Sequence, residues 1–380
     1  MTRSNGHRGG NVMSMRIDTN TLNYYVQNAQ ISLSVLRTKI NNLDQFLSGE
    51  KQPTFNQLSE IAKKINVPTG LLLLNKTIDI DIKRLDFRTL ESDSIDEASE
   101  ELRDTIAEME IKQEFLKNEI TDNLDFVGQF SIESNFLEVA QKIRNKLEIP
   151  LFFQNQADNP LNYLRDKIND IGVFVFFNGK VKDNTHRPLS VKEFRGFVLL
   201  DHKAPIIFIN QKDTKNGQLF TLVHELVHIF VGTEEIFNII DTGNYQFDRT
   251  EAFINKVTAE ILVPQEIFLQ LNSTDSNFLA KKFKVSEFVI VRRLLDLNKI
   301  TRDEYQNRTR DLKESLERFL PSESSGGSYP NNIRFRVDNR FFKYVMNAVN
   351  HDRISYTDAF NIVGVGFKGY KILMNRGGND

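Results

Sequence analysis

Apolar residues near the start of the chain recur every three or four positions, the spacing that places them on one face of a helix. Residues 33–40 carry this pattern, and a short helix is predicted over residues 42–47, with Gly49 ending it. A third helical run begins after Thr54, whose hydroxyl is a favourable N-cap. Short helices separated by tight turns predict a helix-turn-helix unit.

Three short apolar runs in the middle of the chain have the composition of strands. They span residues 172–177, 195–200 and 205–210 and are rich in Val, Ile and Phe. The last two runs flank the polar stretch 201–204, which predicts a hairpin. Helical patterns surround the strands, over residues 134–147, 160–171, 251–264, 276–300 and onwards to Phe319. Strands embedded among helices predict an α+β domain.

Residues 91–125 combine a helical pattern with a strong excess of acidic residues. They hold thirteen Asp and Glu against three Lys and Arg, and apolar residues recur at positions 95, 98, 102, 106, 109 and 116. This pattern predicts an amphipathic helix with an acidic face in solvent. The alternative is a surface that repels or mimics nucleic acid.

Composition and pattern together divide the chain into six segments. The first sixteen residues are polar and glycine-rich, which is typical of a disordered tail. The run Pro321–Pro330 has the composition of a linker, and the short basic segment after it predicts a small helical module. We predict a tail over 1–16, a helix-turn-helix domain over 17–78, a connector with the acidic helix over 79–130, the α+β domain over 131–320, a linker over 321–331 and a C-terminal module over 332–380.

The overall composition narrows the function classes. The 380 residues are 40% hydrophobic and 26% charged with a formal net charge of -2, which argues against extensive coating of nucleic acid but leaves room for a local basic face. Cysteine is absent, so any metal must be bound by His, Asp or Glu. No apolar run has the length of a membrane span and no signal-peptide core follows the first residue, which predicts a cytoplasmic protein without a membrane partner.

The strongest chemical signal is the pattern His-Glu-x-x-His at residues 224–228. On a helix, His224 and His228 lie on one face and can direct two imidazoles at one metal ion, with Glu225 close enough to reach a water on that ion. The surrounding residues are apolar, so this polar trio is predicted to be buried, where it needs partners. The alternative is a core helix whose histidines are satisfied by hydrogen bonds. By composition, the pattern should arise by chance in under about one such chain in a hundred, which favours the metal site.

A third ligand is required for a zinc site that keeps one position open. Glu251 and Asn255 share one face of the helical run 251–264, which places a carboxylate and an amide where a second helix could present them. Asn255 is predicted to orient a ligand by hydrogen bonding. Four other acidic residues remain candidates for the third ligand: Glu234, Glu235, Asp241 and Asp248.

Several of these motifs occur together in a known family. Phe194–Phe197, the strand 205–210, Phe220–His228 and the helix from Glu251 to Pro264 resemble the ImmA/IrrE family of zinc peptidases (the DUF955 group), and the resemblance spans residues 130–300. It implies a zincin-like metallopeptidase core with Glu251 as the third ligand. It also implies cleavage or inactivation of a repressor-type DNA-binding protein.

The N-terminal unit resembles a second family. Residues 47–58 are similar to the phage-repressor (Cro/C1, or XRE) helix-turn-helix family, in which this stretch follows the recognition helix. By that resemblance, Asn42 and Gln45 are candidate base-reading residues, with Lys51 as a further DNA contact. Asp44 opposes the approach of phosphates, so docking to a partner protein is the alternative role.

The sequence therefore predicts a zinc-dependent endopeptidase with one Zn²⁺ per chain. His224, His228 and Glu251 hold the ion, and Glu225 accepts a proton from the attacking water. The predicted partners are a repressor-type protein substrate and, through the helix-turn-helix, DNA or a docking protein. The alternative function is a DNA-binding transcriptional regulator whose zincin domain senses or scaffolds without cleaving. A third hypothesis is an anti-repressor that sequesters a partner and does not depend on zinc.

Overall fold

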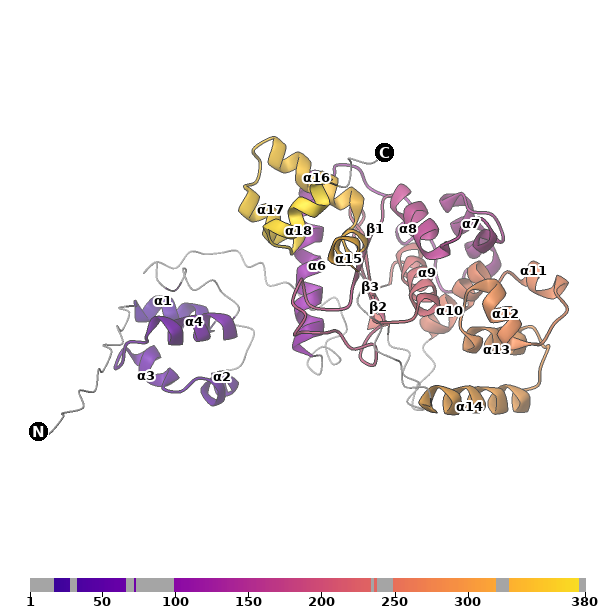
Figure 1. Ribbon diagram of the computed structural model, residues 1–380, viewed down its shortest axis with the longest axis horizontal. Helices are drawn as coiled ribbons and strands as arrows, with labels where there is room; N and C mark the ends of the chain where they lie inside the picture. The colour runs from indigo at the N-terminus through magenta and orange to yellow at the C-terminus, as the bar shows by residue number, and fades with distance from the viewer. Residues whose placement is uncertain are drawn as a thin grey trace, which may run out of the picture. The chain divides into compact units, whose positions relative to one another are not determined.

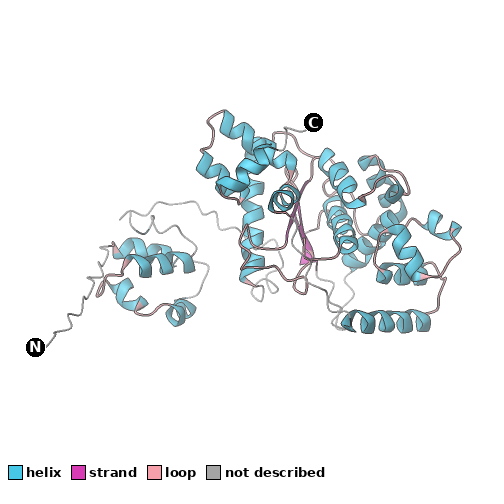
Figure 2. Cartoon of the chain, in the orientation of Figure 1, coloured by secondary structure: helices cyan, strands magenta, loops and turns pink. Residues whose placement is uncertain are grey.

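The computed structural model of the chain is shown in Figure 1. It describes residues 17–27, 33–65, 72, 99–233, 236–237, 249–318 and 328–375. Contacts divide the chain into two compact units, residues 1–84 and 85–380; one hydrophobic core lies in the first unit and two lie in the second. The described residues are mostly helical, with a small sheet in the second unit, so the fold is of the α+β class (Figure 2). Across these ranges, no helix combines the length and the apolar character needed to cross a membrane.

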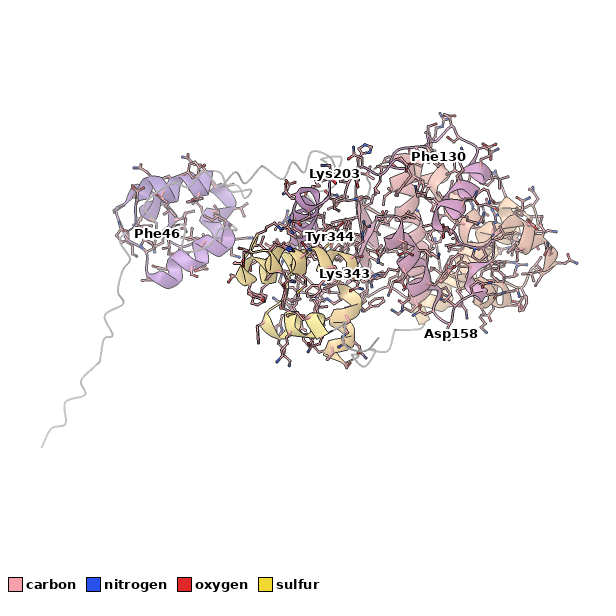
Figure 3. All side chains as sticks on the ribbon, turned by 90° about the horizontal axis from the view of Figure 1, so that it is seen from above. Phe46, Phe130, Asp158, Lys203, Lys343 and Tyr344 are labelled. Atoms are coloured by element: carbon pink, nitrogen blue, oxygen red, sulfur yellow. The ribbon has the colours of Figure 1, made fainter. Side chains whose placement is uncertain are left out.

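The first unit is built from short helices around one apolar core. Its described helices are α1 (Thr19–Gln27), α2 (Leu33–Lys39), α3 (Leu43–Ser48) and α4 (Phe55–Lys64). Leu36, Phe46 and Leu58 come from three of these helices and are buried in the same core; Figure 3 labels Phe46. Helices this short are not stable alone, so the shared core holds them in place.

The ends of these helices follow the predicted signals. Thr54 is the N-cap of α4: its hydroxyl accepts a hydrogen bond from the Gln57 amide, and the Gln57 side chain accepts one from the Thr54 amide. Gly49 ends α3 with a φ of 80°, a left-handed conformation that favours glycine. The predicted helix boundaries at Gly49 and Thr54 are confirmed.

The sheet of the second unit has the strand order β1-β3-β2-β4. Its strands are β1 (Phe174–Asn178), β2 (Gly196–Leu199), β3 (Ile206–Asn210) and β4 (Ile236–Phe237). β1 runs parallel to β3, whereas β2 is antiparallel to both β3 and β4. The predicted hairpin is therefore β2 and β3, and the apolar run at 172–177 contains β1.

Side chains along β1 alternate between two cores, because successive residues of a strand point to opposite faces. Val175 and Phe177 belong to one core, and Phe174 and Phe176 belong to the other. Figure 1 shows the helices of the first core on one side of the strands, where α8 (Pro160–Asp170) and α9 (Lys215–Val231) contact the strands and the others pack beyond them. The helices of this core include α7 (Phe136–Leu147), α8, α9 and α10 (Arg249–Leu262), followed by α11 (Gln265–Gln270), α12 (Ser276–Phe283), α13 (Glu287–Asp296) and α14 (Arg302–Arg318).

The opposite face of the sheet is covered by the acidic helix and the C-terminal helices (Figure 1). These are α6 (Glu100–Glu119), α15 (Tyr329–Arg336), α16 (Asn339–Asn350), α17 (Tyr356–Val363) and α18 (Phe367–Met374). The apolar positions predicted within α6, at 102, 106, 109 and 116, are all buried; positions 95 and 98 lie outside the described residues.

The acidic face of α6 is less exposed than the sequence predicts. Glu108 is buried and forms an ion pair of 2.7 Å with the buried Lys112, whose ammonium also donates to the Ile362 carbonyl. Near the start of the helix, Arg187 pairs with Glu101 and Asp104. The excess of acidic residues here is therefore used in part for contacts within the second unit rather than only for solvation.

The outer edge of β1 is closed by side chains. The Val175 amide donates to a carboxylate oxygen of Asp338 at 3.0 Å, and the Val175 carbonyl accepts from the Arg165 guanidinium at 2.8 Å. Asp338 is itself fully buried and caps α16 by accepting from the Phe341 amide. These side chains satisfy the backbone groups that a neighbouring strand would otherwise bind.

Candidate metal centre

The His-Glu-x-x-His pattern lies on α9, a helix whose two ends are both defined. The Thr214 hydroxyl caps the start by accepting from the Gly217 amide. Gly232 ends the helix with a φ of 79°, a left-handed conformation that favours glycine. The extent of α9 is therefore fixed by residues on either side of the pattern.

α9 is buried along most of its length. It packs against β2, β3 and α10, and every residue from Thr221 to Val231 is buried. His224, Glu225 and His228 are completely buried, as their apolar surroundings predict. Buried polar groups need partners, so the properties of the site depend on what other elements bring to these three side chains.

α10 brings a third metal-ligating side chain to the two histidines. The Nε2 atoms of His224 and His228 are 3.1 Å apart. The Glu251 carboxylate lies 3.4 Å from His224 Nε2 through one oxygen and 3.1 Å from His228 Nε2 through the other. Among the described residues, these three form the group of His and acidic side chains that is compact enough to hold a metal ion.

The spacing of these atoms fits a tetrahedral ion. Zinc bonds of about 2.0–2.1 Å that meet at tetrahedral angles place neighbouring ligand atoms roughly 3.3 Å apart. The two Nε2 atoms, 3.1 Å apart, agree with this value, and each has an oxygen of the Glu251 carboxylate at 3.1 or 3.4 Å, a different oxygen for each histidine. Two imidazoles and one carboxylate are also a donor set that zinc accepts, with a fourth position left for water. The residues present therefore fit a zinc ion.

The protonation states favoured by the site also suit a metal. Burial lowers the pKa of His224 below its ordinary value, so this imidazole is neutral near pH 7. Burial opposes the charge of Glu251, but hydrogen bonds and charge interactions with His224 and His228 outweigh it and lower the Glu251 pKa. A neutral imidazole and a charged carboxylate are the forms that bind a metal ion.

Glu225 lies against the backbone of β2. A Cβ atom added to Gly196 would lie 3.2 Å from Glu225 Oε1, 2.5 Å from Thr221 Cγ2 and 2.9 Å from the Phe208 carbonyl oxygen. Only glycine therefore allows α9 to approach the sheet this closely at this point. The absence of a side chain at Gly196 leaves room for the carboxylate that the sequence analysis assigns to proton transfer.

Each histidine has a separate polar neighbour. Asn255, one turn after Glu251 on α10, acts on His224 by raising its pKa against the larger effect of burial, and its predicted role in orienting that ligand stays a prediction. Thr233, just beyond the end of α9, places its hydroxyl oxygen 2.9 Å from His228 Nδ1. Sequence reasoning missed Thr233, because a polar residue after a helix-ending glycine is ordinary in a loop.

The other predicted site residues are not part of this cluster. Asn42 is exposed with a φ of 63°, Gln45 is partly buried and Lys51 is exposed, all in the first unit. Asp44 forms an ion pair of 2.9 Å with Arg37, so part of its charge is neutralised locally. The rival third ligands Glu234, Glu235, Asp241 and Asp248 lie outside the described residues.

Comparison with known protein families gives a match to the part of the chain that contains this site. Residues 170–295 match the family model Peptidase_M78, described as the IrrE N-terminal-like domain. Neither the comparison with curated proteins nor the comparison with solved structures gave a match. The matched segment contains the whole sheet and both helices that carry His224, His228 and Glu251. Residues 170–295 are therefore similar to a metallopeptidase-type domain of the ImmA/IrrE kind.

Proposed function

We propose that the chain is a zinc-dependent endopeptidase with a zincin-like core and Glu251 as the third metal ligand. The observation that carries this proposal is the cluster of His224, His228 and Glu251, in which the two Nε2 atoms are 3.1 Å apart and each has one of the two Glu251 oxygens at 3.1 or 3.4 Å. The match of residues 170–295 to a peptidase family supports it. We place the activity in the cytoplasm.

The proposed chemistry is hydrolysis of a peptide bond. A zinc ion in this site supplies Lewis-acid activation of a water molecule and of the scissile carbonyl. Glu225 accepts a proton from the attacking water and passes it to the leaving amine as the carbon–nitrogen bond breaks. Its complete burial against Gly196 keeps the Glu225 carboxylate out of bulk water and restricts its movement.

The proposed substrate is a repressor-type DNA-binding protein. The first unit serves as a helix-turn-helix of the XRE type that binds DNA or docks a partner protein. The helices α2 and α3, joined by residues 40–42, support this assignment, because two short helices and a tight turn are the parts of that motif. The ion pair between Arg37 and Asp44 reduces the charge available for phosphates, which favours docking to a protein.

Metal content of the purified chain tests the site itself. We expect one zinc per wild-type chain, and loss or marked weakening of binding in His228→Ala and Glu251→Gln. Glu225→Gln should retain the metal, because Glu225 is not among the ligands. A folded wild type that stays empty after addition of zinc would contradict the proposal.

Cleavage distinguishes the peptidase from the non-proteolytic regulator. A mixture of synthetic peptides is incubated with zinc-loaded protein, and new termini are identified by mass spectrometry. Wild type should cleave and Glu225→Gln should not. A Glu225→Gln chain that binds zinc and still controls target-gene transcription as wild type does would support the regulator instead.

A further inference from the structure

The chain reverses direction immediately after α9 and returns Thr233 to the last turn of the helix. The amides of Gly232 and Thr233 both donate to the His228 carbonyl, at 2.8 and 3.2 Å. In this turn the Thr233 hydroxyl oxygen lies 2.9 Å from Nδ1 of the same histidine. Thr233 therefore contacts His228 through both its backbone and its side chain.

The turn is held from outside by a segment that precedes the sheet in the sequence. The Gly128 amide donates to the Ile229 carbonyl and the Phe130 amide donates to the Phe230 carbonyl, both at 2.9 Å; Figure 3 labels Phe130. A Cβ atom on Gly232 would lie only 2.9 Å from Gly128 Cα, and its φ of 79° also favours glycine. The position of Thr233 thus depends on packing at the helix end, not on the side chain of Thr233 alone.

We propose that Thr233 is a positioning residue that fixes the orientation and tautomer of His228 for metal binding. His228 Nε2 faces His224 and Glu251, so a metal there requires an unprotonated Nε2. The imidazole proton must then reside on Nδ1, from which it donates to the Thr233 hydroxyl oxygen. A hydrogen bond to the second ring nitrogen restrains the ring and raises the basicity of the ligating nitrogen.

This inference deepens the proposed function, because it rests on the metal site and assigns a role to a residue outside the ligand set. His228 would be held by the turn that follows α9 as well as by the helix itself. Loss of the Thr233 hydroxyl should therefore weaken metal binding without removing any ligand.

The test compares Thr233→Val, which keeps the shape and removes the hydroxyl, with Thr233→Ser, which keeps the hydroxyl. Zinc affinity is measured by competition with a chromogenic chelator. We expect Thr233→Val to bind zinc about 10- to 100-fold more weakly, as is typical when a partner of a metal-bound histidine is lost. Thr233→Ser should stay close to wild type, and circular dichroism should show that both variants are folded.

A second measurement does not depend on either variant folding. Nitrogen NMR of zinc-loaded wild type should show a protonated, slowly exchanging Nδ1 on His228. Unchanged zinc affinity in Thr233→Val, or a rapidly exchanging Nδ1 proton in wild type, would overturn the role of Thr233 while leaving the zinc site intact. A wild type that binds no zinc would instead overturn the proposed function, and the role of Thr233 with it.

Discussion

Gly196 shows how one residue can set the distance between the metal-binding helix and the sheet. Replacement by alanine would place a methyl group 2.5 Å from Thr221 Cγ2 and 2.9 Å from the Phe208 carbonyl oxygen. Because one of these neighbours is backbone, the strain cannot be relieved by a side-chain rotation alone. We expect Gly196→Ala to lower the free energy of unfolding of the second unit by about 1–3 kcal/mol, measured by urea denaturation.

Gly366→Ala is the matched control for this variant. A Cβ atom there would meet no atom within 4 Å, and the φ of Gly366 is -77°. Gly366 is the N-cap of α18, where alanine is less favourable than glycine, so a loss below about 1 kcal/mol is expected. Equal effects of the two substitutions would argue against close packing at Gly196.

Burial of His224 predicts a dependence of stability on pH in the metal-free protein. Its pKa is lowered in the folded state, so below the ordinary value of 6.5 the unfolded chain binds a proton that the folded chain does not. This contribution to stability is complete above pH 6.5 and is lost as the pH falls through the folded-state pKa. Urea denaturation with a chelator at about pH 7.5, 6.5 and 5.5 should show this decline.

A histidine outside the site provides the comparison. His202 is exposed, so His202→Gln should retain the same decline, whereas His224→Gln should have a flatter one. A wild-type unfolding free energy that does not change over this range would show that His224 titrates normally.

The sequence predicted those residues of the metal site that lie close together on one helix. His224, Glu225 and His228 are close in sequence, so the period of a helix is enough to relate them. Glu251 lies on a different helix, and sequence alone left rivals for its role. The contact between Thr233 and His228 depends on the turn at Gly232, which periodicity does not describe.

Asp338 joins two elements of the second unit, α16 and β1. It caps the helix and accepts the Val175 amide on the outer edge of the strand. Asp338→Ala leaves both amides without this acceptor, and we expect a loss of about 2–4 kcal/mol in the free energy of unfolding. Asp338→Asn retains one acceptor oxygen and should lose less. A change of under about 0.5 kcal/mol in the alanine variant would contradict this role.

Helices and strands with strong local sequence signals were predicted well, whereas the elements that pack against them were not. The strands of the hairpin and the capped helix α4 follow from alternation, turns and a capping residue. The environment of α6 was predicted less well, because a helical period identifies an apolar face without stating what covers the polar one. Glu108 and Lys112 are buried by helices that follow them by more than two hundred residues.

The two units have separate cores, so we expect the whole chain to unfold in two transitions. Thr54→Ala removes the cap of α4 and should lower the stability of the first unit by about 1 kcal/mol. Zinc at about 100 times its Kd should stabilise the second unit by about 2.7 kcal/mol, and a chelator should reverse this. Calorimetry with and without chelator separates the two effects; a single transition shifted by both would contradict independent units.

The closed edge of β1 also limits how this sheet can associate with copies of itself. Aggregates that grow by strand pairing need two open edges on every molecule, because each new copy must offer a site for the next. Here the amide and carbonyl of Val175 are already bound by Asp338 and Arg165. Strand addition by a folded copy at Val175 would therefore have to displace these two side chains, which makes this part of the edge a poor site for such pairing.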